Sequence, residues 1–146
     1  MSKRLNISLP DEWANISDQY PNGPVTMVWD DPSAVGAFQV STAEYMEGAE
    51  PRPSEADLIK LAVGFGEQHQ WGRLIDSCSG KCVMGAFGTA VFKRTESTPT
   101  ETPAYSQVWF LSNGLDFVFA TFIGMQDPNA REVADAQRIA QGIDFR

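Results

Sequence analysis

The residues of this chain that could do chemistry are two cysteines and a single histidine. Cys78 and Cys82 are separated by three residues, and His69 precedes them. A structural zinc site normally takes four Cys or His ligands, and a thioredoxin-type motif needs C-x-x-C at the start of a helix. Neither pattern is present. We therefore expect no metal site and no cofactor.

The segment Cys-Ser-Gly-Lys-Cys at 78–82 is more typical of the tip of a β-hairpin. Ser79, Gly80 and Lys81 would form the loop, with the two cysteines on the flanking strands. Cross-strand Cβ atoms lie close enough for a disulfide, although so short a closed loop adds little stability. We expect free thiols at a turn, and a disulfide or a redox role for Cys78 and Cys82 stays open as the alternative.

His69 falls at the end of the first predicted helix, where a histidine interacts favourably with the helix dipole without any catalysis. Both cysteines follow it closely, so a Cys–His pair in a thiol-dependent enzyme is an alternative. The glycines at 85 and 88 match neither a nucleophile elbow nor a phosphate-binding loop. We predict that the protein is not an enzyme and has no catalytic residue.

The bulk composition points to one globular domain with a protein partner. The chain has 146 residues, 42% hydrophobic and 21% charged, so residues 1–146 fit a single domain. Its net charge of −8 would repel nucleic acid and an anionic membrane surface, and favours a basic or neutral partner. The longest apolar run, 117–125, is too short to span a bilayer. The first 20 residues contain no apolar segment typical of a secretory signal, so we expect none. We expect a cytoplasmic location.

The first half of the chain predicts strands followed by one helix. The segment 7–13 is expected to start as a short strand, and 25–31 is expected to contain another. In residues 36–45 two sets of side chains alternate with a period of two, which is typical of a half-buried strand. The helix is expected over 54–69. Ser54 would be its N-cap, with Asp57 at the reciprocal position of a capping box.

The apolar face of this helix is predicted from residues three and four apart: Leu58, Leu61, Ala62 and Phe65. Two glycines in its last turn, Gly64 and Gly66, are expected to weaken the helix and to end it.

The clearest hairpin signal lies at 105–124, where Asn113-Gly114 separates two apolar runs. Counting outward from a two-residue turn pairs Phe110 with Phe117 and Val108 with Phe119. Both faces of this hairpin are apolar, so we expect it to be central in the sheet and covered on both sides.

The last predicted element is a helix over 127–145, with Asp127 as its cap and Pro128 at its first position. Its apolar stripe is predicted to contain Val133, Ala136, Ala140 and Ile143, and the residues expected to face water are Arg131, Glu132, Asp135, Arg138 and Gln141. The order of elements predicts an α+β fold, an antiparallel sheet of about six or seven strands with two helices packed on it.

Four tryptophans exceed what one small core requires. If two helices leave part of the sheet uncovered, Trp29, Trp71, Trp109 and Phe122 would form an exposed aromatic patch that binds a partner. The alternative is that the tryptophans are ordinary core residues.

Several segments together resemble the Mog1/PsbP-like domains, which include small bacterial proteins and the DcrB-type domains. These segments are Ile-Ser-Leu-Pro-Asp-Glu-Trp at 7–13, the strand that begins at 36, the hairpin at 105–124 and a closing helix that ends in Ile143-Asp144-Phe145. The resemblance implies the fold and a bias toward binding proteins, and it supplies no catalytic motif.

We therefore predict a non-catalytic protein-interaction module, such as a bacterial immunity protein or a secretion chaperone. Its partner would be another protein, with self-association as a homodimer as an alternative. A small-molecule-binding domain that uses a cleft between sheet and helices is the second hypothesis, and the thiol-dependent enzyme is the third.

Overall fold

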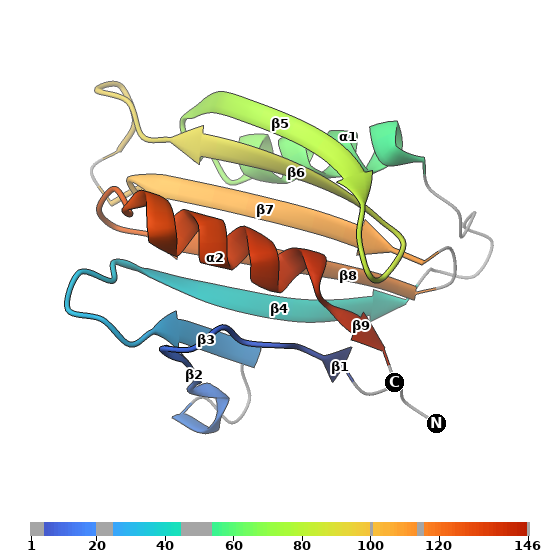
Figure 1. The fold of residues 1–146 in the computed structure, drawn as a ribbon. Coiled ribbons are helices and arrows are strands. Elements are labelled where there is room, and N and C mark those ends of the chain that lie inside the picture. The colour runs from blue at the N-terminus through green and yellow to red at the C-terminus, as the bar shows by residue number, and fades with distance from the viewer. Residues whose placement is uncertain (1–4, 20–24, 45–53, 100, 114–115, 146) are drawn as a thin grey trace.

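The computed structural model describes residues 5–19, 25–44, 54–99, 101–113 and 116–145. Within these residues the main sheet is antiparallel and has seven strands in the spatial order β2-β3-β4-β8-β7-β6-β5. Helix α2 crosses one face of it, in front in Figure 1, and α1 lies on the opposite face. The α+β fold with two helices on an antiparallel sheet is confirmed.

The strands of this sheet are β2 (Trp13–Asn15), β3 (Val25–Trp29), β4 (Gly36–Glu44), β5 (Arg73–Lys81), β6 (Ala86–Lys93), β7 (Tyr105–Ser112) and β8 (Asp116–Gly124). The helices are α1 (Glu55–Gln68), α2 (Ala130–Gln141) and the short 3₁₀ helix η1 (Ser17–Gln19). Two further short strands, β1 (Leu5–Asn6) and β9 (Asp144–Phe145), pair with each other and so join the first and the last described residues. The segment 7–12, predicted to begin a strand, lies between β1 and β2.

The hairpin of β7 and β8 is central, as predicted, but its register is not the predicted one. Phe110 pairs with Phe119 and Val108 with Thr121, two residues away from the expected partners. The turn is therefore longer than two residues, and Gly114 lies outside the described part of the chain. A shift of two residues keeps every side chain on its face, because strand side chains alternate with a period of two. The residues predicted to pair, Phe110 with Phe117 and Val108 with Phe119, therefore still share one face of the sheet.

Each face of the sheet carries its own core. Trp109, Leu111 and Phe122 pack with Ala136 and Ile139 of α2 on one side. On the other side, buried residues of α1, β6 and β7 pack together with Trp71, which follows α1. This second core contains Leu58, Ala62, Trp71, Ala90, Phe92, Val108 and Phe110. No helix in the described residues is long and apolar enough to cross a membrane.

Helix α1 begins as predicted, with Ser54 as N-cap and both hydrogen bonds of the capping box to Asp57. The prediction that the glycines end it is wrong, because the helix continues to Gln68 and His69 is its C-cap. Its buried face is Leu58, Ala62 and Gly66, while Leu61 is 43% exposed. The small residues at 62 and 66 allow the helix to lie close to the sheet.

Helix α2 starts later than predicted, because Asn129 and not Asp127 is its N-cap. Glu132 and Asp135 were expected to face water, and both are buried. The apolar stripe of Ala136, Ala140 and Ile143 is buried as expected. The pattern missed the two acids because their burial depends on partners outside the helix.

The turn between β5 and β6 is not formed by Cys-Ser-Gly-Lys-Cys. Strand β5 continues through Gly80 and Lys81, and Cys82 and Gly85 exchange two backbone hydrogen bonds around the actual turn. Cys78 pairs with Thr89 and not with Cys82. The cross-strand cysteine pair was therefore a wrong prediction, because the tip of the hairpin is formed by Val83 and Met84 and not by residues 79–81.

Candidate functional site

The four aromatic residues predicted to form an exposed patch are core residues. Trp29 and Trp71 are each 6% exposed, and Trp109 and Phe122 are fully buried. They also lie on different faces of the sheet, since Trp71 belongs to the α1 side and the other three to the α2 side. The alternative, ordinary core, is the correct interpretation of these positions.

The structure separates the histidine from both cysteines. The His69 ring stacks on Phe65 with centroids 4.2 Å apart, on the α1 side, and its Nδ1 lies 2.8 Å from the Phe65 carbonyl oxygen. Cys82 packs on the α2 side, and Cys78 shares that face with its partner Thr89. The sheet therefore lies between the imidazole and the thiols.

Both thiols are free. Burial raises the pKa of the Cys78 and Cys82 thiols, and nearby carboxylates raise them further. A thiolate nucleophile needs a lowered pKa, so neither environment activates its cysteine.

The edge strand β5 is exposed over most of its length. In the described residues it has a hydrogen-bonded neighbour on one side only, β6. The residues from Arg73 to Cys78 are all exposed, including the apolar Leu74 (39%) and Ile75 (47%). A free antiparallel edge presents unpaired backbone N–H and C=O groups at alternate residues, which another strand can join.

A β-bulge shapes this edge. The register of β5 against β6 shifts between Leu74 and Asp76, which leaves Ile75 without a paired residue. Bulges turn side chains out of the regular alternation. Here Leu74 pairs with Phe92 on the α1 side, whereas Ile75 and Asp76 both line a groove on the α2 side.

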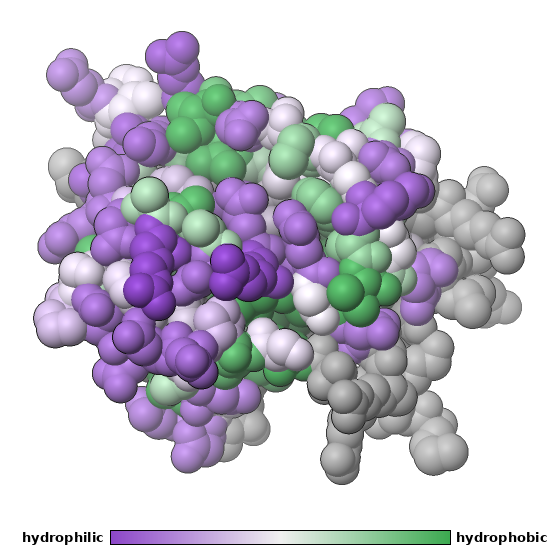
Figure 2. Space-filling view, in the orientation of Figure 1, coloured by the Kyte–Doolittle hydropathy of each residue, from purple (hydrophilic) through white to green (hydrophobic). Residues whose placement is uncertain are grey.

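This groove lies between the β5 edge and α2, and we name it the β5–α2 groove. Its volume is about 530 Å³, within the range of about 300–1,000 Å³ that is typical of ligand sites. Its lining residues are Ile75, Asp76, Val91, Lys93, Tyr105, Asp127, Pro128, Ala130, Val133, Ala134 and Gln137. Figure 2 shows hydrophobic surface over the part of the molecule where β5 and β6 lie, with hydrophilic residues around it.

The rim of the groove carries charge. Lys93 Nζ lies 3.6 Å from Asp127 Oδ1, an ion pair between the end of β6 and the segment that leads into α2. Asp76 stands on the β5 side, exposed, with no ion pair in the described residues. Burial, and then the Asp76 carboxylate, raise the pKa of Tyr105 to about 12, which keeps this lining residue neutral.

The floor of the groove is held by a chain of buried hydrogen bonds. The Tyr105 hydroxyl donates to Gln107 Oε1 at 2.9 Å, and Gln107 Nε2 donates to Thr89 Oγ1 at 3.0 Å. Thr89 in turn donates to the carbonyl oxygen of Val108 at 2.8 Å. Because every member has a partner in a buried environment, the floor is fixed in one arrangement.

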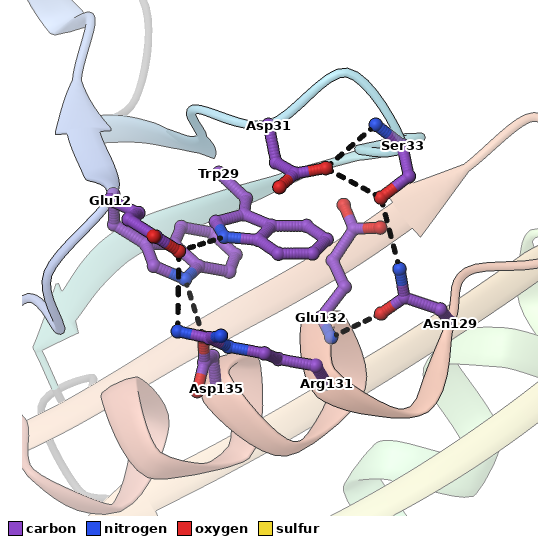
Figure 3. A network of polar contacts seen from close by, with 9 residues as sticks. Glu12, Trp29, Asp31, Ser33, Asn129, Arg131, Glu132 and Asp135 are labelled. Atoms are coloured by element: carbon purple, nitrogen blue, oxygen red, sulfur yellow. Dashed lines mark hydrogen bonds and ion pairs between the residues drawn. The ribbon is translucent and has the colours of Figure 1, made fainter.

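The other wall, α2, is locked to the sheet by a polar network on its opposite side (Figure 3). The buried carboxylate of Glu132 accepts hydrogen bonds from the backbone N–H of Val35 at 3.2 Å and of Gly36 at 3.0 Å. Burial raises the pKa of Glu132, and these two hydrogen bonds oppose the rise. The N-cap Asn129 also donates to Ser33 Oγ at 3.2 Å. The start of α2 is thus fastened to the segment between β3 and β4.

The N-terminal segment joins the same network. The Trp13 indole donates to Asp135 Oδ2 at 3.0 Å, and Trp29 Nε1 donates to Glu12 Oε2 at 3.4 Å. Arg131 reaches Glu12 Oε2 at 3.2 Å and lies over the Trp29 ring, 5.9 Å from its centroid. These contacts hold one side of α2, so that Ala130, Val133, Ala134 and Gln137 on its other side form the groove wall.

Sequence reasoning missed this site. The spacing of Ala130, Val133, Ala134 and Gln137 does mark one face of a helix, and Asn129 with Glu132 three residues later is a helix-start pattern. Neither signal shows that the carboxylate of Glu132 points to another segment. The bulge at Ile75 has no sequence signature in this strand.

The fold is shared with solved structures of low sequence identity. No family model matches the chain, and no curated protein matches it in sequence. LpqN of Mycobacterium tuberculosis, described as involved in cell envelope biogenesis, has a TM-score of 0.62 at 15% identity over 99% of this chain and 84% of its own. The cyanobacterial PsbP (CyanoP) of Synechocystis has a TM-score of 0.58 at 10% identity, over 97% of this chain and 86% of its own.

A protein from Bacteroides thetaiotaomicron gives a TM-score of 0.54 at 17% identity, and the chain spans 45% of that protein's length. These similarities concern the fold alone, because the identities are low. The fold of this chain is that of the Mog1/PsbP-like domains.

Proposed function

We propose that this protein is a non-catalytic interaction module that binds an extended segment of a partner protein along the β5 edge. The segment adds a strand to the sheet and places an apolar side chain in the β5–α2 groove. The proposed role is that of an accessory protein, such as an immunity protein or a secretion chaperone. A cytoplasmic location goes with this proposal as a prediction.

The observation that carries the proposal is a long exposed edge strand beside an apolar groove. Strand addition gives affinity through backbone hydrogen bonds and specificity through pockets for alternate side chains. β5 is nine residues long and offers the backbone edge. The groove offers one pocket, on the α2 side. At the other end of the sheet, β2 has only three residues.

Charge favours another protein over a second copy of this chain. Each copy carries a net charge of −8, so two copies repel each other at long range. A homodimer seen by light scattering would contradict this part of the proposal.

The test uses random peptides displayed on phage, selected on the immobilised protein and then synthesised. The selected peptides are expected to protect the backbone amides of β5 from hydrogen exchange. The Ile75→Lys variant should weaken their binding about five- to tenfold, because burying the remaining half of an isoleucine contributes about 1–1.5 kcal/mol.

The matched control is Leu61→Lys, since Leu61 is exposed to a similar extent, 43% against 47%, but lies on α1, on the other face of the sheet. This variant should bind the peptides as the wild type does. Failure to select any peptide, or selected peptides that ignore the Ile75→Lys change, would contradict the proposal.

A second candidate is a small-molecule-binding domain, favoured by the volume of the groove and its apolar walls. A thermal-shift screen of small apolar compounds tests it. A compound that raises Tm and whose effect is lost in Ile75→Lys would support this function in place of the first.

A further inference from the structure

We infer that the segment bound at β5 carries a basic residue two positions from its apolar anchor, and that Asp76 selects this residue. The inference rests on the proposed function and names the chemistry of the partner. It makes Asp76 the residue of the β5–α2 groove that determines specificity.

The position of Asp76 follows from the bulge. Asp76 pairs with Val91, a groove residue, so its side chain lies on the α2 side of the edge. Asp76 is one of the two residues of β5 that line the groove, and β5 is the free edge strand of the described sheet. A strand added there would place its own cross-strand residue beside this carboxylate, on the same face.

The charges around the groove leave the Asp76 carboxylate uncompensated. Lys93, the lining cation, pairs with Asp127. Lys81, which lies on β5 like Asp76, pairs with Glu55 of α1 at 3.3 Å. Arg73 stands at the start of β5, opposite Lys93 in register, and makes no ion pair with Asp76 in the described residues. The lining residues therefore carry two carboxylates and one ammonium group.

Electrostatic effects on the neighbours are consistent with this position. The Asp76 carboxylate raises the pKa of both Tyr105 and Cys78, after the larger effect of burial. It therefore acts on the groove floor and on the next groove-side position of the edge. A lysine or arginine placed beside it gains an opposite charge next to an apolar surface that its methylene groups can cover.

The spacing follows from strand geometry. Side chains at positions i and i+2 of an added strand point to the same face. An anchor over Ile75 and Val91 and a basic residue beside Asp76 then lie on the groove side, with one residue between them that points to the α1 side. The expected pattern is apolar-x-Lys/Arg, or its reverse, depending on the direction of the segment.

The test repeats the phage selection on three proteins: the wild type, Asp76→Lys, and the control Asp18→Lys. Asp18 is exposed in η1, next to β3 and far from β5 in the sheet, and its substitution changes the net charge by the same amount. Circular dichroism confirms that each variant is folded. The wild type and the control should enrich a basic residue two positions from an apolar one.

Asp76→Lys should instead enrich Asp or Glu at that position, and should bind the wild-type peptides about tenfold more weakly. If peptides bind at β5 but their charge is the same for all three proteins, the inference is overturned and the proposed function stands. If no protein selects a peptide that protects β5, the proposed function itself fails.

Discussion

Gly64 and Gly66, near the C-terminal end of α1, provide a sharp test of how closely the helix packs on the sheet. A Cβ added at Gly64 meets nothing within 4 Å, whereas a Cβ at Gly66 would lie 2.0 Å from Cε1 of Phe92. The Phe92 ring is 1% exposed and packs against the edge of Trp71, so it has little room to move. The same substitution, glycine to alanine, should therefore have opposite effects at the two positions.

The magnitude follows from two terms. Alanine in place of glycine stabilises a helix interior by about 0.8–1 kcal/mol, and both variants receive this gain. Only Gly66→Ala adds the cost of an overfilled core, about 1–3 kcal/mol and nearer the upper end for so close an approach. We expect Gly64→Ala to be more stable than the wild type by about 0.8 kcal/mol. Gly66→Ala should be less stable by about 2 kcal/mol.

Urea denaturation followed by circular dichroism measures both free energies of unfolding. With a slope of about 2 kcal/mol per molar urea, the midpoints of the two variants should differ by about 1.5 M. The slope itself should not change, since neither substitution alters the surface exposed on unfolding. Equal stabilisation in both variants would show that α1 does not approach Phe92 closely, and would refute the helix–sheet contact described above.

Two further predictions concern titratable groups. Because burial raises the pKa of Glu132 above its ordinary value of 4.5, this carboxyl makes the folded state less stable as the pH rises from that value through its folded pKa. The Glu132→Gln variant has no carboxyl to titrate at this position, so its free energy of unfolding relative to the wild type should increase between about pH 4 and pH 7, as measured by urea denaturation. If this difference in free energy does not change with pH, the pKa of Glu132 is not raised in the folded state. Since the pKa values of Cys78 and Cys82 are both raised, neither thiol should react with iodoacetamide at about pH 6. As the pH rises, the exposed Cys78 should react first. Labelling of either cysteine at about pH 6 would contradict these directions and would support the hypothesis of a thiol-dependent enzyme.

The local patterns of the sequence predicted elements well where one element's own residues decide the outcome. Ser54 and Asp57 form the capping box because both lie within four residues of each other, and the faces of β7 and β8 follow from strict alternation. The register of that hairpin was two residues off because the turn is longer than two residues, and β8 is also aligned by β4 along its whole length. The fold class needed only such local patterns.

The candidate site depends on contacts between distant segments, which is why sequence reasoning missed it. The helical pattern predicted that Glu132 faces water. It is buried instead, because the backbone N–H groups of Val35 and Gly36 donate hydrogen bonds to its carboxylate. Trp29 reads as a candidate for an exposed patch, and Arg131 and Glu12 lie against it instead.

The sequence by itself determined the types of the main elements, the apolar faces of the central hairpin and an acidic chain without a complete catalytic motif. Only the tertiary structure decided which residues remain exposed, because burial depends on how far each helix extends over a seven-stranded sheet. Helix α2 lies in front of the middle of the sheet and not over β5 (Figure 1), and Ile75 and Asp76 at the bulge both line the groove between β5 and α2. That arrangement creates the groove and the free edge on which the proposed function rests.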